Sequence, residues 1–167
     1  KRTLDYDLTN PSWKIGNIER EIPIIASAMD SVVDVDTAVE LSNLGAIGVL
    51  NMEGIQTRYE NPKEILSRIS SVGKNEFVPL MQEIYSEPIK EDLILQRINE
   101  IKQKDGIAAL SGTPQAAIKF KETLVKSKID LFFLQGTVVS TKHLGMDGKE
   151  TLLSLIHISE PTRLSRI

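Results

Sequence analysis

Four groups of polar and small residues contain the side chains of this 167-residue sequence that could bind a ligand. Each group directly follows a short apolar run. The groups are residues 27–30 (SAMD), 51–54 (NMEG), 111–113 (SGT) and 135–137 (QGT). Hydroxyl, amide and carboxylate groups form hydrogen bonds with polar ligands, and small residues let a ligand approach the backbone. Together the groups predict the rim of a binding site, although residues 111–113 taken alone fit a loop and helix cap better.

Three residues in these groups allow two interpretations each. Met29 either fills a gap in the core or contacts the ligand. Asp30 either accepts hydrogen bonds from ligand hydroxyls or caps the following turn. Glu53 either holds a base or ribose or pairs with Arg58.

The sequence lacks the residues that several other kinds of site require. The sequence contains no cysteine, which excludes disulfides, cysteine metal sites and a thiol nucleophile within it. His143 has no metal-ligand spacing around it, so no metal site is expected. The glycine patterns of P-loops and dinucleotide-binding turns are absent. Gly45 and Gly48 are therefore expected to serve a turn and close packing.

Composition and charge are those of an ordinary globular domain. Apolar residues make up 41% of the sequence, charged residues make up 26%, and the formal net charge is −3. Lys and Arg are scattered among Asp and Glu, so no basic stripe suits nucleic acid or an anionic membrane. No apolar run approaches the ~20 residues of a membrane-spanning helix. We expect a cytoplasmic protein that binds neither nucleic acid nor membranes.

The apolar runs before the four groups predict buried strands. They cover residues 22–26, 46–50, 107–110 and 129–134. Amphipathic segments between them predict helices over residues 37–44, from residue 62, across residues 94–101, and after residue 114. Residues 80–84 give a weaker helical pattern, and the segment before residue 22 is expected to be irregular.

Capping residues mark the ends of these helices. Asp36 is expected to cap the first helix, and Gly45 to stop it. Asn61 is expected to cap the second, with Glu64 closing a capping box. Thr113 is expected to cap the helix that follows the third strand.

Alternating strands and helices predict an α/β fold with a parallel sheet, whose ligands gather at the carboxyl ends of the strands. The pattern fits an open doubly wound sheet and a closed barrel equally well. A (β/α)8 barrel has about 250 residues, so about four strands within residues 1–152 would be an incomplete one.

The end of the sequence is expected to be non-native. Residues 153–163 (LSLIHISEPTR) match an in-frame translation of the transposase adapter used to prepare sequencing libraries. A short amphipathic helix is the alternative, but Pro161 interrupts it. The expected organisation is one incomplete domain over residues 1–152 and a tail over residues 153–167, in which His157 has no role.

Several motifs resemble one enzyme family. Residues 25–33 (IASAMDSVV) and 44–51 (LGAIGVLN) resemble the first and second strand regions of IMP dehydrogenases and GMP reductases. Four further segments resemble the branch of this family called IMP dehydrogenase-related: residues 53–54 (EG), 57–62 (TRYENP), 83–88 (EIYSEP) and 135–140 (QGTVVS). The resemblance covers nearly all of residues 1–152, and it implies the first half of a (β/α)8 TIM barrel, with about four parallel strands and flanking helices.

The resemblance also implies ligands for the rim. A purine mononucleotide, IMP or GMP, would lie against Ser27, Met29, Asp30, Asn51 and Glu53. The nicotinamide cofactor, NAD or NADP, would lie against Gln135, Gly136 and Thr137. On this basis Met29 is expected to contact the ligand rather than fill a core gap.

The activity implied for the parent protein is that of a purine-nucleotide oxidoreductase. In the family, a cysteine forms a covalent adduct at purine C2, and the nicotinamide cofactor carries the hydride. That cysteine follows the sixth strand, beyond the end of this chain, so the chain alone is expected to be inactive. The parent is expected to form homo-tetramers or larger assemblies, and the half barrel alone to aggregate through its open strand edges.

Two departures from the family pattern bear on function. Typical IMP dehydrogenases carry Asp-Ser-Ser-Gln-Gly after the fourth strand, whereas only Gln135 and Gly136 match here, after Leu134. This difference favours GMP reduction over IMP oxidation. The segment between the second and third strands is too short for the regulatory CBS pair that most relatives insert there. The alternative function is a non-catalytic purine-nucleotide-binding or regulatory protein of the same fold.

Overall fold

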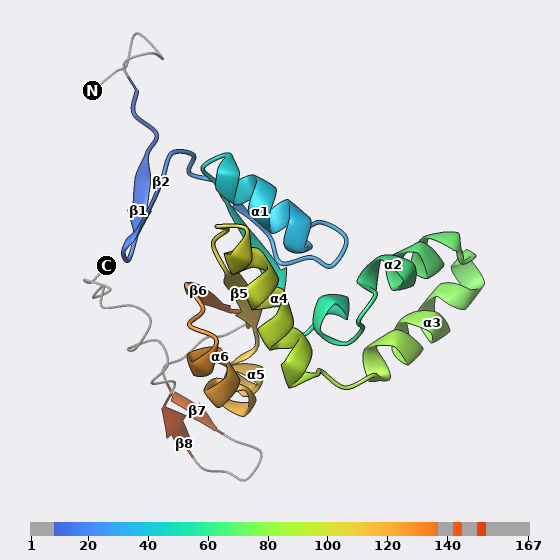
Figure 1. Ribbon diagram of the computed structural model, residues 1–167. Coiled ribbons are helices and arrows are strands. Elements are labelled where there is room, and N and C mark those ends of the chain that lie inside the picture. The colour runs from blue at the N-terminus through green and yellow to red at the C-terminus, as the bar shows by residue number, and fades with distance from the viewer. Residues whose placement is uncertain (1–8, 137–141, 145–149, 153–167) are drawn as a thin grey trace.

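The computed structural model describes residues 9–136, 142–144 and 150–152 (Figure 1), and side chains are described within the first of these ranges. Its elements are β1 (Trp13–Ile15), β2 (Ile18–Arg20), β3 (Ile25–Ala26), α1 (Val35–Asn43), β4 (Ile47–Asn51), the 3₁₀ helix η2 (Ile55–Thr57), α2 (Pro62–Ser71), α3 (Lys74–Ser86), α4 (Glu91–Gln103), β5 (Ala109–Gly112), α5 (Pro114–Lys119), α6 (Lys121–Lys126), β6 (Leu131–Leu134), β7 (Lys142–Leu144) and β8 (Glu150–Leu152). The expected tail, residues 153–167, lies outside the described residues.

The central feature is a four-stranded parallel sheet in the order β3-β4-β5-β6. All four expected strands are confirmed, with slightly shifted ends. Strand order follows chain order without the reversal that defines a doubly wound sheet, so the sheet has the winding of a barrel. The fold is therefore α/β and corresponds to part of a (β/α)8 barrel.

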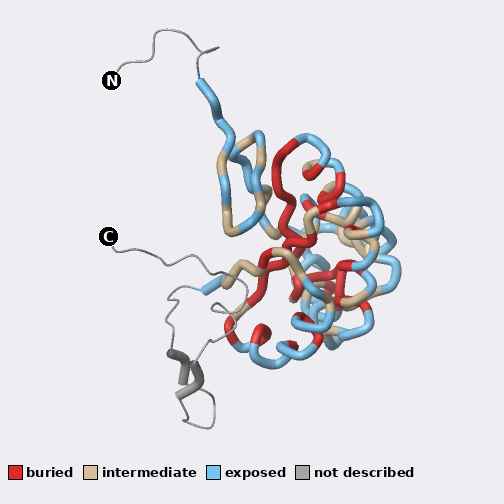
Figure 2. The backbone as a smooth tube through the Cα atoms, turned by 60° about the vertical axis from the view of Figure 1, so that its left-hand side comes forward, coloured by how far each residue is buried: buried red, intermediate tan, exposed pale blue. Residues whose placement is uncertain are grey.

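The two faces of the sheet bury different sets of residues. Leu50 and Leu110 pack with Ile94 and Ile98 of α4 in a fully buried core that also includes residues of α1, α5 and α6. On the opposite face, β4, β5 and β6 contribute Ile47, Val49, Ala109 and Leu131. These residues pack against Trp13, Ile15 and Ile18 of the β1–β2 hairpin. Figure 2 shows the buried backbone concentrated in the strands and in the helix turns next to them.

A helical insert, defined as residues 55–90, separates β4 from α4. In Figure 1 the hairpin of α2 and α3 extends away from the sheet. The insert has a small core of its own, in which Ile55, Leu80 and Ile84 are buried. Residues 80–84 are helical as expected, but α3 is longer than the pattern indicated and passes through Pro79.

Two expectations about the first part of the chain are wrong. Residues 13–20 of the segment expected to be irregular form an antiparallel hairpin of β1 and β2, which turns at Gly16 with φ +56°. The N-cap of α1 is Asp34, whose Oδ1 accepts a hydrogen bond from the Thr37 N–H at 2.8 Å. Asp36 lies inside the first turn, because the helix begins at Val35.

The remaining cap predictions have mixed outcomes. Gly45 stops α1 with φ +85°, as expected. Thr113 caps α5, accepting a hydrogen bond from Ala116 N–H at 3.2 Å. Asn61 precedes α2 as expected, but its side-chain amide donates to the Glu64 carboxylate at 3.2 Å instead of capping the backbone. Phe120 divides the expected single helix into α5 and α6.

Candidate functional site

The rim, defined as residues 27–30, 51–54, 111–113 and 135–136, lies along the carboxyl ends of the four parallel strands. Asn51 pairs in register with Ser111, and Ser111 pairs with Phe133, so the three share one face of the sheet. This is the face that carries Val49 and Ala109, opposite the helices. The sheet pairing continues into the rim, because Met52 N–H donates to the Ser111 carbonyl at 2.9 Å.

Glu53 joins the second and third rim groups. Its carboxylate accepts hydrogen bonds from the Thr113 backbone N–H at 2.5 Å and from the Thr113 hydroxyl at 3.2 Å. The expected pairing with Arg58 involves the backbone instead, since the guanidinium donates to the Glu53 carbonyl at 3.1 and 3.2 Å. The carboxylate therefore fixes the start of α5 against the end of β4.

Asp30 joins the first rim group to the second and to the insert. Its Oδ2 accepts a hydrogen bond from the Tyr85 hydroxyl of α3. Its Oδ1 lies against Gly54, where an added Cβ would be only 1.8 Å away. Neither interpretation of Asp30 from the sequence included this arrangement, in which a residue 55 positions later in the chain holds the carboxylate.

The Tyr85 phenol remains a hydrogen-bond donor at neutral pH. Burial of the side chain raises the pKa of Tyr85 above its ordinary value of 10.0, and the neighbouring Asp30 carboxylate raises it further. Arg58 lies over the Tyr85 ring, with 5.6 Å from the guanidinium carbon to the ring centroid, and has a smaller opposing effect on this pKa. The proton therefore stays on Tyr85, and Asp30 accepts the hydrogen bond.

Met29 and Ser27 are the rim residues most accessible to a ligand. The Met29 side chain is 53% exposed, so it does not fill a gap in the core. Its backbone is fixed in a turn, with the N–H groups of Val32 and Val33 donating to the Met29 carbonyl at 2.9 and 3.0 Å. Ser27 is also exposed. This segment presents a thioether and a hydroxyl to solvent from an ordered turn.

Asn51 presents hydrogen-bond donors through its side-chain amide. Its side-chain oxygen accepts a hydrogen bond from Glu53 N–H at 3.1 Å, which fixes the orientation of the amide. Its side-chain nitrogen donates to none of the residues that the structure describes, and the residue is half-buried. The amide N–H groups can therefore serve a ligand on the sheet face opposite the helices.

The fourth rim group follows β6. Gln135 N–H donates to the Gly112 carbonyl at 2.9 Å, which places Gln135 beside the third group. Gln135 and Gly136 are exposed. Thr137, the third residue expected to contact the cofactor, lies outside the described residues.

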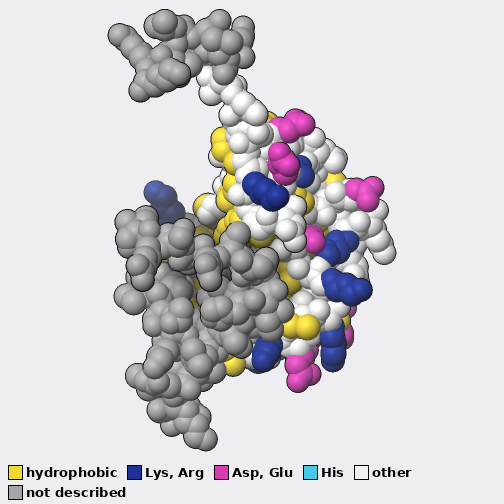
Figure 3. Space-filling view, turned by 90° about the vertical axis from the view of Figure 1, so that its left-hand side faces the viewer, with side chains coloured by type: hydrophobic (Ala, Val, Ile, Leu, Met, Phe, Trp, Pro, Cys, Tyr) yellow, Lys and Arg dark blue, Asp and Glu magenta, His cyan; other side chains and the backbone are white. Residues whose placement is uncertain are grey.

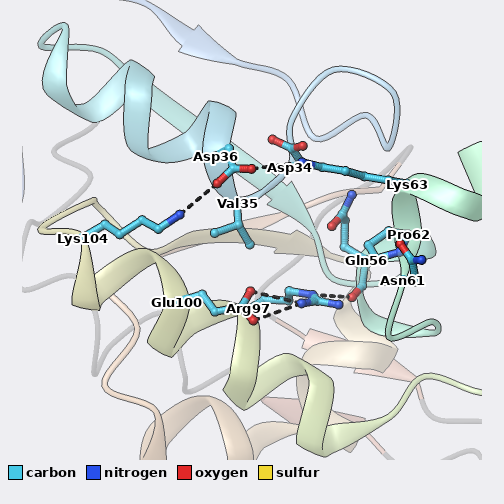
Figure 4. A pocket seen from close by; sticks show the side chains of 10 residues that line it. All are labelled: Asp34, Val35, Asp36, Gln56, Asn61, Pro62, Lys63, Arg97, Glu100 and Lys104. Atoms are coloured by element: carbon cyan, nitrogen blue, oxygen red, sulfur yellow. Dashed lines mark hydrogen bonds and ion pairs between the residues drawn. The ribbon is translucent and has the colours of Figure 1, made fainter.

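A second polar region lies on the helix side of the sheet. This outer cavity, of about 400 Å³, lies between α1, η2, α2 and α4 (Figure 4). Asp36 pairs there with Lys63 at 3.1 Å and with Lys104 at 2.9 Å. Arg97 pairs with Glu100 at 3.1 Å. The charged groups of the outer cavity thus neutralise one another.

Arg97 has a structural role that the sequence analysis missed. Its side chain is 7% exposed, and its guanidinium donates to the carbonyls of Gln56, Tyr59 and Glu60 at 3.0, 3.2 and 2.8 Å. The signal was its spacing, because residue 97 falls among the buried positions 94, 98 and 101 of α4. Tyr85, the other residue missed, adjoins the buried Ile84 in a motif that the family resemblance had included.

Metal sites and membrane spans have little support in the described part of the chain. No three His, Cys, Asp or Glu side chains among the described residues are close enough together to hold a metal ion. None of the helices over the described ranges has the length and apolar character needed to cross a bilayer. Among the described side chains visible in Figure 3, Lys and Arg alternate with Asp and Glu.

Comparison with known proteins identifies relatives of this chain. No model of a known protein family matches it. An uncharacterized oxidoreductase of Mycolicibacterium smegmatis is 30% identical over 154 residues, and those of Mycobacterium tuberculosis and Mycobacterium leprae are 29% and 28% identical. Each match covers 89% of this chain and 41% of the relative. The chain therefore spans less than half the length of the curated relatives that it matches.

A solved structure shares the fold. The crystal structure of an IMP dehydrogenase/GMP reductase-like protein from Corynebacterium glutamicum superposes with a TM-score of 0.78 at 22% sequence identity. The match covers 87% of this chain and 40% of that protein. It agrees with the strand order, which also indicates part of a (β/α)8 barrel.

Proposed function

We propose that the protein containing this chain is an oxidoreductase that acts on a purine mononucleotide with NAD or NADP. The observation that carries this proposal is the rim, where ordered polar residues from four strands meet at the end of the sheet at which parallel α/β folds bind ligands. The oxidoreductase names of the curated relatives and the fold of the Corynebacterium protein support the same class.

The rim residues divide into two roles. Ser27, Met29 and Asn51 contact the mononucleotide, because they are accessible or hold an unused donor. The Met29 thioether provides a polarisable surface for the flat purine, and contacts of this kind are favourable. Asp30 and Glu53 position these groups, since their carboxylates already accept hydrogen bonds from Tyr85 and Thr113.

Gln135 and Gly136 fit a nicotinamide cofactor. An exposed amide at the end of β6 can hydrogen bond with the carboxamide of nicotinamide, and a glycine beside it lets the ring approach the backbone. Bound there, the cofactor would accept or donate the hydride. We place the nucleophilic cysteine in the part of the parent that this chain does not contain. Phe132 and Leu134 stand where the typical Asp-Ser-Ser-Gln-Gly stretch has its Asp and its second Ser. This departure favours GMP reduction as the direction.

The test uses the complete reading frame that contains this chain. The purified protein is mixed with GMP and NADPH or NADH, and separately with IMP and NAD or NADP, while absorbance of the reduced cofactor is followed. Consumption of the reduced cofactor with GMP is the expected result. Turnover with IMP but not with GMP would reverse the proposed direction of the reaction and keep the proposed enzyme class.

A matched pair of variants tests the site. Met29→Ala is expected to weaken mononucleotide binding at least about fivefold, measured by calorimetry, because it removes an exposed contact surface. Val125→Ala changes a side chain of α6 with nearly the same exposure, 51% against 53%, and should leave binding unchanged. Equal behaviour of the two variants contradicts the proposed site.

Two results would overturn the enzymatic proposal. Mononucleotide binding without turnover, together with a complete sequence that has no cysteine in the second half, would support a binding or regulatory protein of this fold. Absence of any mononucleotide binding would reject the ligand class itself.

A further inference from the structure

The contact between α3 and the rim connects the helical insert to the ligand-facing segment. Tyr85 is near the end of α3, and Asp30 directly follows the exposed Met29. Their hydrogen bond joins residues 55 positions apart and is made from outside the repeating strand-and-helix framework. The insert therefore reaches the rim through a specific polar contact.

The Arg58 side chain helps to hold Tyr85 in this position. Arg58 lies over its ring, and the same guanidinium donates to the carbonyls of Glu53 and Glu87. Glu53 belongs to the rim and Glu87 is the C-cap of α3. Arg58 thus holds the end of the insert against the second rim group while Tyr85 binds the first.

Asp30 has little freedom once Tyr85 is bound. The whole carboxylate lies so close to Gly54 that no Cβ fits there, which restricts its movement further. Asp30 is adjacent to Met29, and the turn at Met29 is closed by the N–H groups of Val32 and Val33. Fixing Asp30 therefore restricts the backbone of the turn from which the Met29 side chain projects.

We propose that Tyr85 is a positioning residue for the purine site, holding residues 27–33 in the arrangement that binds the mononucleotide. The inference rests on the proposed function, which supplies the ligand. Tyr85 does not touch the nucleotide; it acts through Asp30 and the turn that carries Ser27 and Met29. The insert between β4 and α4 thereby takes part in ligand binding.

The chain offers a matched control in Tyr59. The Tyr59 hydroxyl donates to the Ile84 carbonyl at 3.0 Å, so it also contributes one hydrogen bond within the insert. It differs from the Tyr85 hydroxyl in making no contact with the rim. Tyr85→Phe and Tyr59→Phe each remove one hydroxyl and keep the ring, so a general loss of insert stability should affect both in the same way.

The binding experiment uses the complete protein and GMP or IMP as the probe. Tyr85→Phe is expected to weaken binding roughly tenfold, the effect of losing a hydrogen bond to a charged group. Tyr59→Phe should bind as the unmodified protein does. When Asp30→Ala is already present, adding Tyr85→Phe should change the Kd less than twofold, because the two residues act as a unit. Equal Kd values for Tyr85→Phe and the unmodified protein overturn the proposal.

Hydrogen exchange provides a readout that needs no nucleotide. In the free protein, Tyr85→Phe should speed exchange at the amides of Val32 and Val33, whose bonds to Met29 close the turn. Tyr59→Phe should leave these amides unchanged. If the unmodified protein binds no mononucleotide, the proposed function and the role in binding both fail. Exchange then still decides whether Tyr85 holds the segment, and unchanged exchange overturns that part as well.

Discussion

The rim and the outer cavity are both polar and both contain carboxylates, yet they treat those carboxylates differently. In the outer cavity, Asp36 and Glu100 pair with lysine and arginine side chains. At the rim, Asp30 and Glu53 accept hydrogen bonds from neutral donors, the Tyr85 hydroxyl and the Thr113 N–H and hydroxyl. None of the described Lys or Arg side chains forms an ion pair with either rim carboxylate.

This difference separates a structural region from a binding region. Ion pairs that neutralise one another leave little for a ligand to recognise, and they connect the elements that carry them. Carboxylates whose partners are neutral hydroxyl and N–H donors have no basic side chain paired with them, so the described part of the rim suits hydroxyl and amine donors of a ligand rather than phosphate. The outer cavity is accordingly not where we place the ligand.

The largest effect is expected at the outer cavity. Arg97→Ala removes the donor shared by three backbone carbonyls in a buried position, and it should lower the free energy of unfolding by about 3 kcal/mol. Urea unfolding measures this change. Nucleotide affinity under folding conditions should be unchanged, since Arg97 contacts no rim residue.

Arg68→Ala is the control for this variant. Arg68 pairs with Glu83 at 3.0 Å, but both side chains are at least half exposed, so the loss should be within about 1 kcal/mol. A large loss of nucleotide affinity in Arg97→Ala would show that the two regions are not separate.

An intermediate effect is expected at the rim. Gly54→Ala places a Cβ 1.8 Å from Asp30 Oδ1, so the carboxylate must shift and its hydrogen bond with Tyr85 is disturbed. We expect roughly tenfold weaker nucleotide binding and a stability loss of about 1–3 kcal/mol from overpacking. Calorimetry and urea unfolding measure the two quantities.

Gly73→Ala is matched to Gly54→Ala. Gly73 is also a helix N-cap with negative φ, but no atom lies within 4 Å of a Cβ built on it. Less than about 1 kcal/mol should be lost, the difference between Gly and Ala at an N-cap. Equal nucleotide affinity of the two glycine variants would contradict the assignment of the rim as the binding region.

The smallest effect concerns pH and the outer cavity. Hydrogen bonding and charge attraction from Lys104, and then Lys63, hold the pKa of Asp36 below its ordinary value of 3.8. A lowered folded-state pKa stabilises the fold above the ordinary value, and this contribution is lost as pH falls through the lowered one. Asp36→Asn should therefore be slightly less stable at neutral pH, with the difference vanishing in acid.

Urea midpoints measured from neutral pH downward test this expectation. Glu122→Gln serves as the control, because its partner Lys126 is 3.9 Å away and the Glu122 side chain is 88% exposed. It should show no pH-dependent difference. A difference for Asp36→Asn that grows in acid would contradict the assigned direction of the pKa shift.

Local patterns predicted the sheet well, because all four strands fall in short apolar runs and the two central strands, β4 and β5, are buried on both faces. They failed where tertiary contacts decide the outcome. The β1–β2 hairpin is short, and its Trp13 gains burial only by packing on the sheet. In α3, Pro79 concealed a helix that packing of Leu80 and Ile84 stabilises.

The rim groups were also predictable, since they follow strands whose carboxyl ends must meet. Their internal bonding was not. Spacing gave no means of pairing Asp30 with Tyr85, because that contact depends on how the insert folds back. Spacing likewise predicted Arg58 as the partner of the Glu53 carboxylate. The observed partner is Thr113, at the start of α5 and sixty positions away.

The attachment of the insert has a consequence for how such a protein can diverge. The Lys90 N–H donates to the Thr57 carbonyl at 2.9 Å, so the chain leaves and re-enters the framework at neighbouring points. A segment joined by so narrow a neck, with its own apolar core, can be lengthened, shortened or exchanged while the strands keep their pairing. Because Tyr85 is carried on that segment, each exchange would also alter the mouth of the barrel. New ligand preferences could arise by swapping a cassette that contains none of the barrel strands.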